Sequence, residues 1–348
     1  MPDFFSGTGR NLPAMLLLRP LSLTRPFLLV FLLLGGWCSA WAQDDADTTS
    51  YPTRPIRLIV PMPAGGGTDV WARVTAERMS QLLGQKVLVD NRPGAGTMIG
   101  AEFVAHAPAD GYTLLVGDIG TFALNPHLHR KMAYDPARDF TPVTLTSRHL
   151  LVLAVPRKSD LSSVPGLIER AREQPGALNY GSAGVGSPHH LAMELLQQRS
   201  GALLRHVPYK SGAALTADML AGQLAAAFID LPSALPHLRS GWLRGLALAA
   251  PQRLPYLPDL PTMEELGFAG FEAWAWQGLV APAGTPPAVV ARLNAAYAQV
   301  CSEAETRRRL GMVGIELTPS TPQEFSAFQH AESERWGQLI RDHGILVD

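Results

Sequence analysis

The most informative stretch of the chain is Pro61-Met62-Pro63-Ala64-Gly65-Gly66-Gly67-Thr68-Asp69. It follows a short apolar run at 56–60 and precedes a helical pattern that begins near Val70. A strand, a glycine loop and a helix start therefore succeed one another directly. The glycines have no Cβ atom, so the backbone can turn sharply and a ligand can approach its amides. Thr68 or Asp69 can cap the helix, whose first N–H groups favour an anion. The stretch predicts a carboxylate or phosphate cradle, with a plain tight turn before a capped helix as the alternative.

Short β-type runs alternate with amphipathic helices along the rest of the chain, which predicts α/β architecture with mainly parallel sheets. We expect strands at 58–60, 87–89, 113–116, 150–155, 178–180, 205–209, 225–229 and 243–249. We expect helices at 70–83, 97–105, 165–173, 188–199, 211–221, 286–300 and 322–343.

Two further strand–loop–helix junctions, at 91–97 and 181–188, share the chemistry of 61–69. Each offers glycine amides at a helix N-terminus, and Ser187 with Pro188 suits the N-cap and first helical positions. In open α/β sheets ligands bind at the carboxyl ends of strands, where such loops gather. If these loops face one cleft, the site is rich in neutral donors and poor in fixed positive charge. That composition suits a small carboxylate.

The first 42 residues have the features of a secretory signal peptide. Arginines precede the apolar run 27–34, and Ala40 with Ala42 forms a small-residue cleavage site before Gln43. The apolar run is far shorter than the ~20 residues of a membrane-spanning helix. We therefore expect a periplasmic protein that is cleaved between Ala42 and Gln43, with Met15 as an alternative start.

Cysteine content and charge narrow the class of protein. Cleavage would remove Cys38 and leave Cys301 as the remaining cysteine, which excludes an intrachain disulfide and a cysteine-based zinc site. The formal net charge of the whole chain is −1, which gives no indication of a nucleic-acid or membrane-surface role. We expect a monomer without a nucleic-acid partner. Roughly 300 mature residues are long for one hydrophobic core, so we expect two lobes.

Motifs of nucleotide-binding and hydrolytic enzymes are absent or incomplete. Neither a P-loop nor a dinucleotide-binding glycine motif occurs. Residues 180–184 resemble a nucleophile elbow, but a tyrosine replaces its first glycine. We expect no catalytic residues, with a secreted hydrolase centred on Ser182 or Ser187 as the alternative.

The paired histidines His189-His190 allow two interpretations, a metal site or a polar helix start. His190 and Glu194 are four residues apart on one helix face, a spacing that can serve a metal. A zinc site needs three or four ligands of defined geometry, and no clear third ligand accompanies this pair. We interpret the pair as a polar helix start with one ring near the ligand loop, and expect neither a metal nor a cofactor.

Short segments that share a characteristic order run from Tyr51 to about Ile345. They include Tyr51-Pro52, Pro63-Ala64-Gly65-Gly66, Asn91-Arg92-Pro93-Gly94-Ala95-Gly96, Asp110-Gly111-Tyr112-Thr113-Leu114-Leu115, Tyr134-Asp135-Pro136, Tyr180-Gly181-Ser182, His206-Val207-Pro208-Tyr209-Lys210, Leu260-Pro261-Thr262 and Ala281-Pro282-Ala283-Gly284-Thr285-Pro286. In number and order they resemble the periplasmic substrate-binding proteins of tripartite tricarboxylate transporters, the Bug family.

The resemblance implies two α/β lobes hinged around a ligand cleft, similar to type II periplasmic binding proteins. It implies lobe one at 43–148 and 278–348 and lobe two at 149–277. It also implies capture of a small organic acid for delivery to the membrane permease subunits of a tripartite tricarboxylate-type transporter. A ligand-sensing adaptor for a membrane receptor is the alternative binding role.

The resemblance further implies a ligand-binding set in which small side chains and backbone amides hold a carboxylate. Asp69 would contact the ligand through ordered water or an ammonium group. The implied set is Met62, Ala64, Gly65, Gly66, Gly67, Thr68, Asp69, Gly120, Thr121, Ala183, Gly184, Val185, Gly186, Ser187 and Asp230. Met62 replaces a usual phenylalanine, which makes one wall more adaptable. Asp118 would repel a nearby carboxylate, so it either points away or tunes specificity.

Overall fold

The computed structural model describes residues 50–65, 67–312 and 315–347. The predicted signal peptide and Gly66 of the glycine loop lie outside these residues. The strands are β1 (Ile56–Val60), β2 (Val87–Asn91), β3 (Thr113–Asp118), β4 (Phe140–Pro156), β5 (Asn179–Ser182), β6 (Arg205–Pro208), β7 (Ala226–Asp230), β8 (Leu243–Leu248), β9 (Trp274–Pro282) and β10 (Ile315–Leu317).

The α-helices are α1 (Gly67–Leu83), α2 (Met98–Ala105), α3 (Asn125–Leu128), α4 (Val164–Glu173), α5 (Pro188–Ser200), α6 (Gly212–Leu220), α7 (Leu231–Arg239), α8 (Pro287–Ser302), α9 (Ala304–Gly311) and α10 (Pro322–Asp342). Two short helical turns, η2 (Ala95–Thr97) and η3 (Gly120–Leu124), precede α2 and α3. Every strand and helix expected from the sequence is present. The sequence did not lead us to expect β9, β10, α3, α7 or α9, nor that β4 begins at Phe140.

The strands pair in the order β2-β1-β3-β9-β4-β7-β5-β6, with β8 and β10 also paired to β4. The α/β class is confirmed, and the sheet is mixed rather than mainly parallel. β1 is parallel to β2 and β3, and β5 is parallel to β6 and β7. β4 and β9 are antiparallel to their neighbours, and β9 was not expected from the sequence, which is why the mixed pairing was missed.

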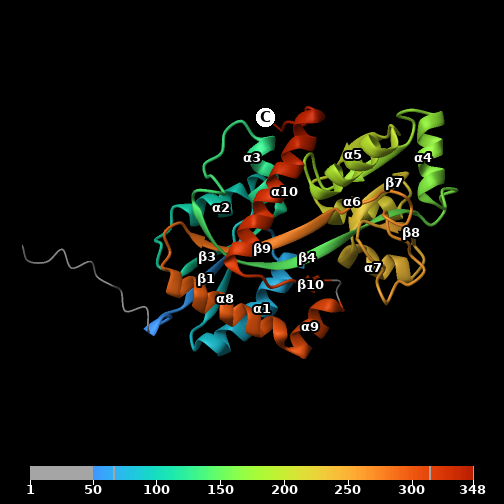
Figure 1. The fold of residues 1–348 in the computed structure, drawn as a ribbon. Helices are drawn as coiled ribbons and strands as arrows, with labels where there is room; N and C mark the ends of the chain where they lie inside the picture. Colours follow the sequence, from blue (N-terminus) through green and yellow to red (C-terminus); the bar gives the residue numbers. More distant parts are fainter. Residues whose placement is uncertain (1–49, 66, 313–314, 348) are drawn as a thin grey trace, which may run out of the picture. The chain divides into compact units, whose positions relative to one another are not determined.

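The sheet has two groups of strands, one with β1, β2 and β3 and the other with β5, β6, β7 and β8. β4 and β9 run side by side between these groups (Figure 1). Phe140 to Leu150 of β4 pair with β9, whereas Leu151 to Pro156 pair with β7 and β8. The segment Leu150 to Pro156 is buried throughout, as expected for a strand covered on both faces. This strand therefore belongs to both groups.

Alternate residues of β1 face two different layers of helices. Ile56, Leu58 and Val60 join the core that includes Trp71 of α1 and Tyr297 of α8. Ile59 joins the other core, to which α2 and α10 contribute. In Figure 1, α1, α8 and α9 accordingly lie on one side of β1 and β3, and α2, α3 and α10 on the other. The strands of this part of the chain are thus buried between two helical layers.

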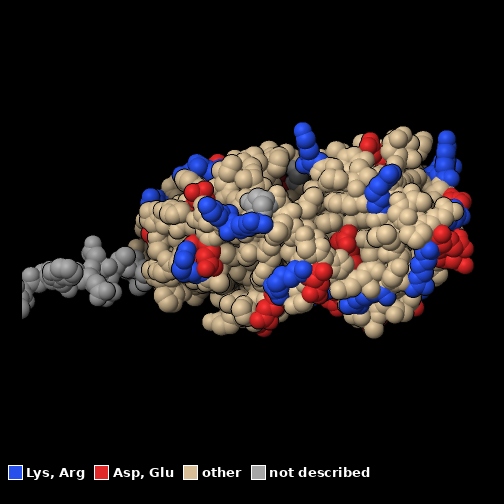
Figure 2. All heavy atoms as spheres, turned by 90° about the horizontal axis from the view of Figure 1, so that it is seen from above, with Lys and Arg blue, Asp and Glu red and all other residues tan. Residues whose placement is uncertain are grey.

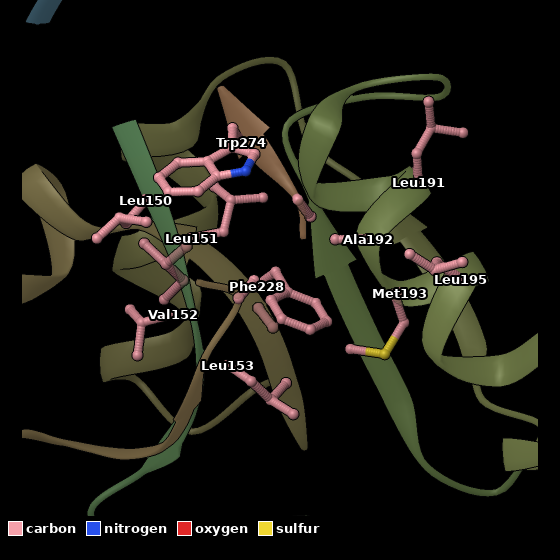
Figure 3. Packing of buried hydrophobic residues seen from close by; sticks show 14 of the residues in the cluster. Leu150, Leu151, Val152, Leu153, Leu191, Ala192, Met193, Leu195, Phe228 and Trp274 are labelled. Atoms are coloured by element: carbon pink, nitrogen blue, oxygen red, sulfur yellow. The ribbon is translucent and has the colours of Figure 1, made fainter. Parts of the chain in front are cut away.

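The second group of strands packs against α5. Figure 3 shows Phe228 of β7 between Leu153 of β4 and Met193 of α5, with Trp274 of β9 near Leu151. Phe228 is fully buried. Truncating such a ring to alanine costs about 3–5 kcal/mol of stability. The packing of Phe228 against Met193 therefore stabilises the position of α5 and of the loop that precedes it.

The surface carries charges of both signs. Figure 2 shows Lys and Arg interspersed with Asp and Glu on the face seen from above. In the described part of the chain, no helix combines the length and the apolar character needed to cross a bilayer.

Candidate ligand-binding site

A cavity of about 850 Å³ lies among the carboxyl ends of β3 and β7, the middle of β4 and the start of β9. This volume is typical of small-molecule sites. Its wall includes Gly67 and Thr68 of α1, the turn η2, Gly120, and the loop at 183–187. The three glycine-bearing junctions expected from the sequence therefore meet at one cavity.

Four helix N-termini contribute residues to the cavity wall: those of α1, α2, α5 and α7. Ser187 caps α5 by accepting a hydrogen bond from the His190 amide at 3.3 Å, and Pro188 is the first helical residue, as predicted. Helix N-termini carry unpaired N–H groups and a partial positive charge. The cavity therefore favours an anion without basic side chains; neither Lys nor Arg is found among its described lining residues.

Asp69 has a different place from the one expected. Its carboxylate accepts hydrogen bonds from the Gly65 amide and Arg73 Nε, each at 2.9 Å, and from Asn91 Nδ2 at 3.0 Å. The hydrogen bond from Arg73 is the main reason why the pKa of Asp69 falls to about 2. Asp69 is 4% exposed and is not part of the cavity wall. It holds the glycine loop to the end of β2, and contact of Asp69 with a ligand stays a prediction.

Asp118 lies at the cavity, whereas Thr121, which was expected to line it, does not. Thr121 is fully buried and donates to Asp118 Oδ1 from both its amide and its hydroxyl at 2.8 Å. Burial raises the pKa of the Asp118 carboxyl against the effect of these hydrogen bonds. A ligand carboxylate therefore meets less repulsion from Asp118 than from an ordinary aspartate.

A histidine–carboxylate pair forms the other end of the cavity. His189 Nε2 lies 3.1 Å from Asp230 Oδ2, which joins the first turn of α5 to the end of β7. His149 comes from the middle of β4, and Gln277 from β9 donates to Thr68 Oγ1. Side chains from β4, from β9 and from the first turns of α1 and α5 therefore surround the same cavity.

A family model described as the tripartite tricarboxylate transporter family receptor matches residues 71–345. The chain belongs to this family. Its members are periplasmic solute receptors of the Bug type. BugT of Bordetella pertussis is 37% identical to this receptor over 307 residues, which cover 88% of this chain and 94% of BugT.

Solved structures of similar receptors have the same two-lobed periplasmic binding fold. Rpa4515 of R. palustris, solved with adipate, is 38% identical, with a TM-score of 0.78 over 84% of this chain and 98% of that one. MatC of Rhodopseudomonas palustris, solved with bound malate, is 32% identical, with a TM-score of 0.74 over 83% of this chain and 100% of that one. The two-lobed fold expected from the resemblance is therefore confirmed.

The receptor brings many of the predicted site residues to the cavity wall. Those that line it are Met62, Gly67, Thr68, Gly120, Ala183, Val185, Gly186, Ser187 and Asp230. Ala64, Gly65, Asp69, Thr121 and Gly184 do not line it, and Gly66 lies outside the described residues. Contact of the lining residues with a ligand stays a prediction.

Some residues that line the cavity of the receptor lie outside glycine loops and were not expected from the sequence. Asn125, His149 and Gln277 line the cavity. Gln277 is on a strand that the sequence did not predict, and His149 precedes the apolar run that marked β4. One ring of the His189-His190 pair was expected near the ligand loop, and His189 lines the cavity there. A polar residue next to an apolar strand run is the signal that could have found His149.

Proposed function

We propose that this receptor captures a small organic acid in the cavity and delivers it to the permease subunits of a tripartite tricarboxylate-type transporter. The convergence of four helix N-termini on one cavity carries the proposal. Such termini bind carboxylates through backbone N–H groups. Two similar receptors, one solved with adipate and one with bound malate, support the same ligand class.

We propose that amides of two loops hold the acid from opposite lobes. Gly67 and Thr68 belong to lobe one, at 43–148 and 278–348, and the 183–187 loop belongs to lobe two, at 149–277. The change of β4 partners between Leu150 and Leu151 supports this division. Lobe closure about β4 and β9 would then trap the ligand, in the manner of hinged binding proteins.

The binding role is also favoured over the hydrolase alternative. Ser182 Oγ lies 2.6 Å from His206 Nε2, which is close enough for a nucleophile–base pair. However, Ser182 is fully buried, hydrogen-bonds to Gly184, and does not line the cavity. The hydroxyl of Ser187 caps α5. We therefore propose a non-enzymatic, monomeric receptor.

A ligand screen on the protein purified from the periplasmic fraction tests this function. N-terminal sequencing of that protein would also test cleavage before Gln43. An acid present at about 100 times its dissociation constant adds about 2.7 kcal/mol to stability, and hence several degrees to the melting temperature. We expect such a rise with one or a few acids from a panel of mono-, di- and tricarboxylates, aromatic acids and amino acids.

The proposal fails if no acid raises the melting temperature and denaturing extraction releases no bound acid. Uptake of the labelled acid by cells that lack the receptor separates transport from sensing. Lost uptake supports delivery to a permease. Normal uptake with a lost transcriptional response to the acid supports the sensing adaptor.

A further inference from the structure

The end of the cavity formed by β7 and α5 has an acidic character. Asp230 is the N-cap residue of α7, and its side chain is 25% exposed. Burial acts to raise the pKa of Asp230, but the charges of His189 and His149 and the hydrogen bond with His189 outweigh it and leave the pKa below its ordinary value. The side chain is therefore an ionised acceptor in the cavity wall.

The two histidines beside Asp230 extend this set of acceptors. His189 is 6% exposed and His149 is 7% exposed, and both line the cavity. Nδ1 of His189 and Nε2 of His149 are buried, and the described residues offer neither of them a hydrogen-bond partner. Burial lowers the pKa of His149, against the opposing effect of the Asp230 charge. When His189 donates from Nε2 to Asp230 and Nδ1 carries no proton, Nδ1 is an acceptor.

Two of the helix N-termini at the cavity have an anion beside them: Asp69 of α1 is paired with Arg73 and does not line the cavity, whereas Asp230 at α7 does line it. Asp230 immediately precedes α7, and an anion at this position is stabilised by the helix dipole. A second carboxylate from a ligand would therefore meet a negative charge there, with neither lysine nor arginine among the described lining residues to offset it. A group that carries positive charge and donates hydrogen bonds would meet Asp230 and unpaired imidazole nitrogens.

We propose that the ligand is an amino acid-like zwitterion, whose ammonium group binds at Asp230 while its carboxylate binds at the amides of the α1 loop. This inference rests on the proposed function and narrows its ligand class. Asp230 is the residue that selects the ammonium group, and His149 and His189 position it and supply further acceptors. An ammonium group has three donors, which matches the acceptors of these three side chains.

A dicarboxylate is the competing ligand class, and it would require protons. The titratable side chains that line the cavity are Asp118, His129, His149, His189 and Asp230. A second ligand carboxylate at the Asp230 end would be stable only if the surrounding imidazoles or carboxylates took up protons on binding. An amino acid would bind without this uptake. The number of protons taken up therefore distinguishes the two classes.

Calorimetric titration of the periplasmic protein with matched pairs of acids tests the proposal. Suitable pairs are succinate with aspartate, glutarate with glutamate, and adipate with 6-aminohexanoate, each at pH 7 in two buffers of different ionisation enthalpy. We expect at least one amino compound to bind at least about tenfold more tightly than its partner, without proton uptake.

The variant Asp230→Asn removes the charge and keeps an oxygen that can accept from His189. It should weaken the amino compound about tenfold or more and leave the acid without the amine unchanged or tighter. Asp160→Asn is the matched control, because Asp160 lies in an exposed ion pair with Arg170 away from the cavity. It should change neither affinity.

Each outcome decides between the hypotheses. Tighter binding of the dicarboxylate with proton uptake overturns the zwitterion proposal and leaves the solute-receptor function intact. An amino preference that survives in Asp230→Asn overturns the role of Asp230. If neither member of any pair binds the wild-type protein, and the wider acid screen is also negative, the proposed function itself fails and the inference fails with it.

Discussion

The Gly186 amide donates a hydrogen bond to Nδ1 of His190 at 3.0 Å, which ties the 183–187 loop to α5. Nδ1 is therefore unprotonated, and the proton lies on Nε2, 3.6 Å from Glu194 Oε1. The ring also stacks on His206 with a centroid distance of 4.0 Å. Burial, with smaller effects of His206 and His343, lowers the pKa of His190 to about 3. A loop of the ligand cavity thus depends on a neutral histidine.

We predict that the folded protein loses stability as the pH falls from about 6.5 toward 3. In this window the unfolded chain binds a proton at His190, whose ordinary pKa is 6.5, whereas the folded protein does not until about pH 3. The unfolded state therefore binds more protons, and the free energy of unfolding decreases as the pH is lowered. Urea unfolding at a series of pH values measures this slope.

The variant His190→Gln should have a shallower slope between pH 6.5 and 3. His330→Gln is the control, because that side chain is 77% exposed, and it should keep the wild-type slope. Equal slopes for wild type and His190→Gln would show that another group controls the acid sensitivity.

We predict that Gly186→Ala weakens ligand binding at least about tenfold. A Cβ at Gly186 would lie 2.2 Å from Leu128 Cδ1, and its φ of +72° is unfavourable for alanine. Leu128 also lines the cavity, so the substitution would push the 183–187 loop away from its opposite wall. Calorimetry with the ligand found in the screen gives the change in affinity.

Gly184→Ala separates the clash from the backbone strain. Gly184 also has a positive φ, of +124°, but the nearest atom to an added Cβ is Tyr209 O at 3.7 Å. It should weaken binding much less than Gly186→Ala. Equal losses in the two variants would mean that backbone strain, and not contact with Leu128, limits binding.

We predict that Asp69→Ala lowers the free energy of unfolding by about 1–3 kcal/mol, because it removes the acceptor of the Gly65 amide and of Asn91 Nδ2. Since Asp69 does not line the cavity, every acid that binds should weaken by a similar factor. Asp160→Ala, at a side chain that is 71% exposed, should change stability by less than about 0.5 kcal/mol. A selective loss of one acid with unchanged stability would instead indicate direct ligand contact.

We predict that Gly278→Ala destabilises the protein by about 1–3 kcal/mol. An added Cβ on β9 would lie 1.9 Å from Cζ of the buried Phe325 ring, which packs edge-on against Trp276 beside the cavity. Gly311→Ala meets no atom within 4 Å and should be neutral or stabilising. Denaturant unfolding compares the two, and similar stabilities would mean that Phe325 moves aside without cost.

Local patterns predicted the elements whose signals lie within a few residues. Ser187 and Pro188 marked the start of α5, and α1 ends at Leu83 as expected, directly before Gly84 with its φ of +71°. The direction of a side chain at a turn was harder to predict. Thr121 and Asp118 are three residues apart, and their mutual hydrogen bonds bury the threonine and leave the aspartate at the cavity. Such an arrangement depends on packing around the turn and not on residue type.

Contacts between distant parts of the chain account for most of the cavity residues that were missed. Gln277 of β9 donates a hydrogen bond to Thr68 of α1. His149 lies at the cavity because β4 pairs with β9 before it pairs with β7. Neither pairing has a local signature. Apart from Asp230 at the end of β7, the predicted residues that line the cavity are on glycine-bearing loops, where the sequence itself specifies an exposed backbone.

The sharing of β4 between both groups of strands has a consequence for how the chain is divided. Thr144 pairs with Leu279, so the strand group that starts near the N-terminus is completed only when β9 has been synthesised. Such long-range pairing slows folding. A fragment that ends before β9 would leave edges of β3 and β4 open to pair with other chains. Expression of a fragment that ends before β9 should therefore yield aggregated protein.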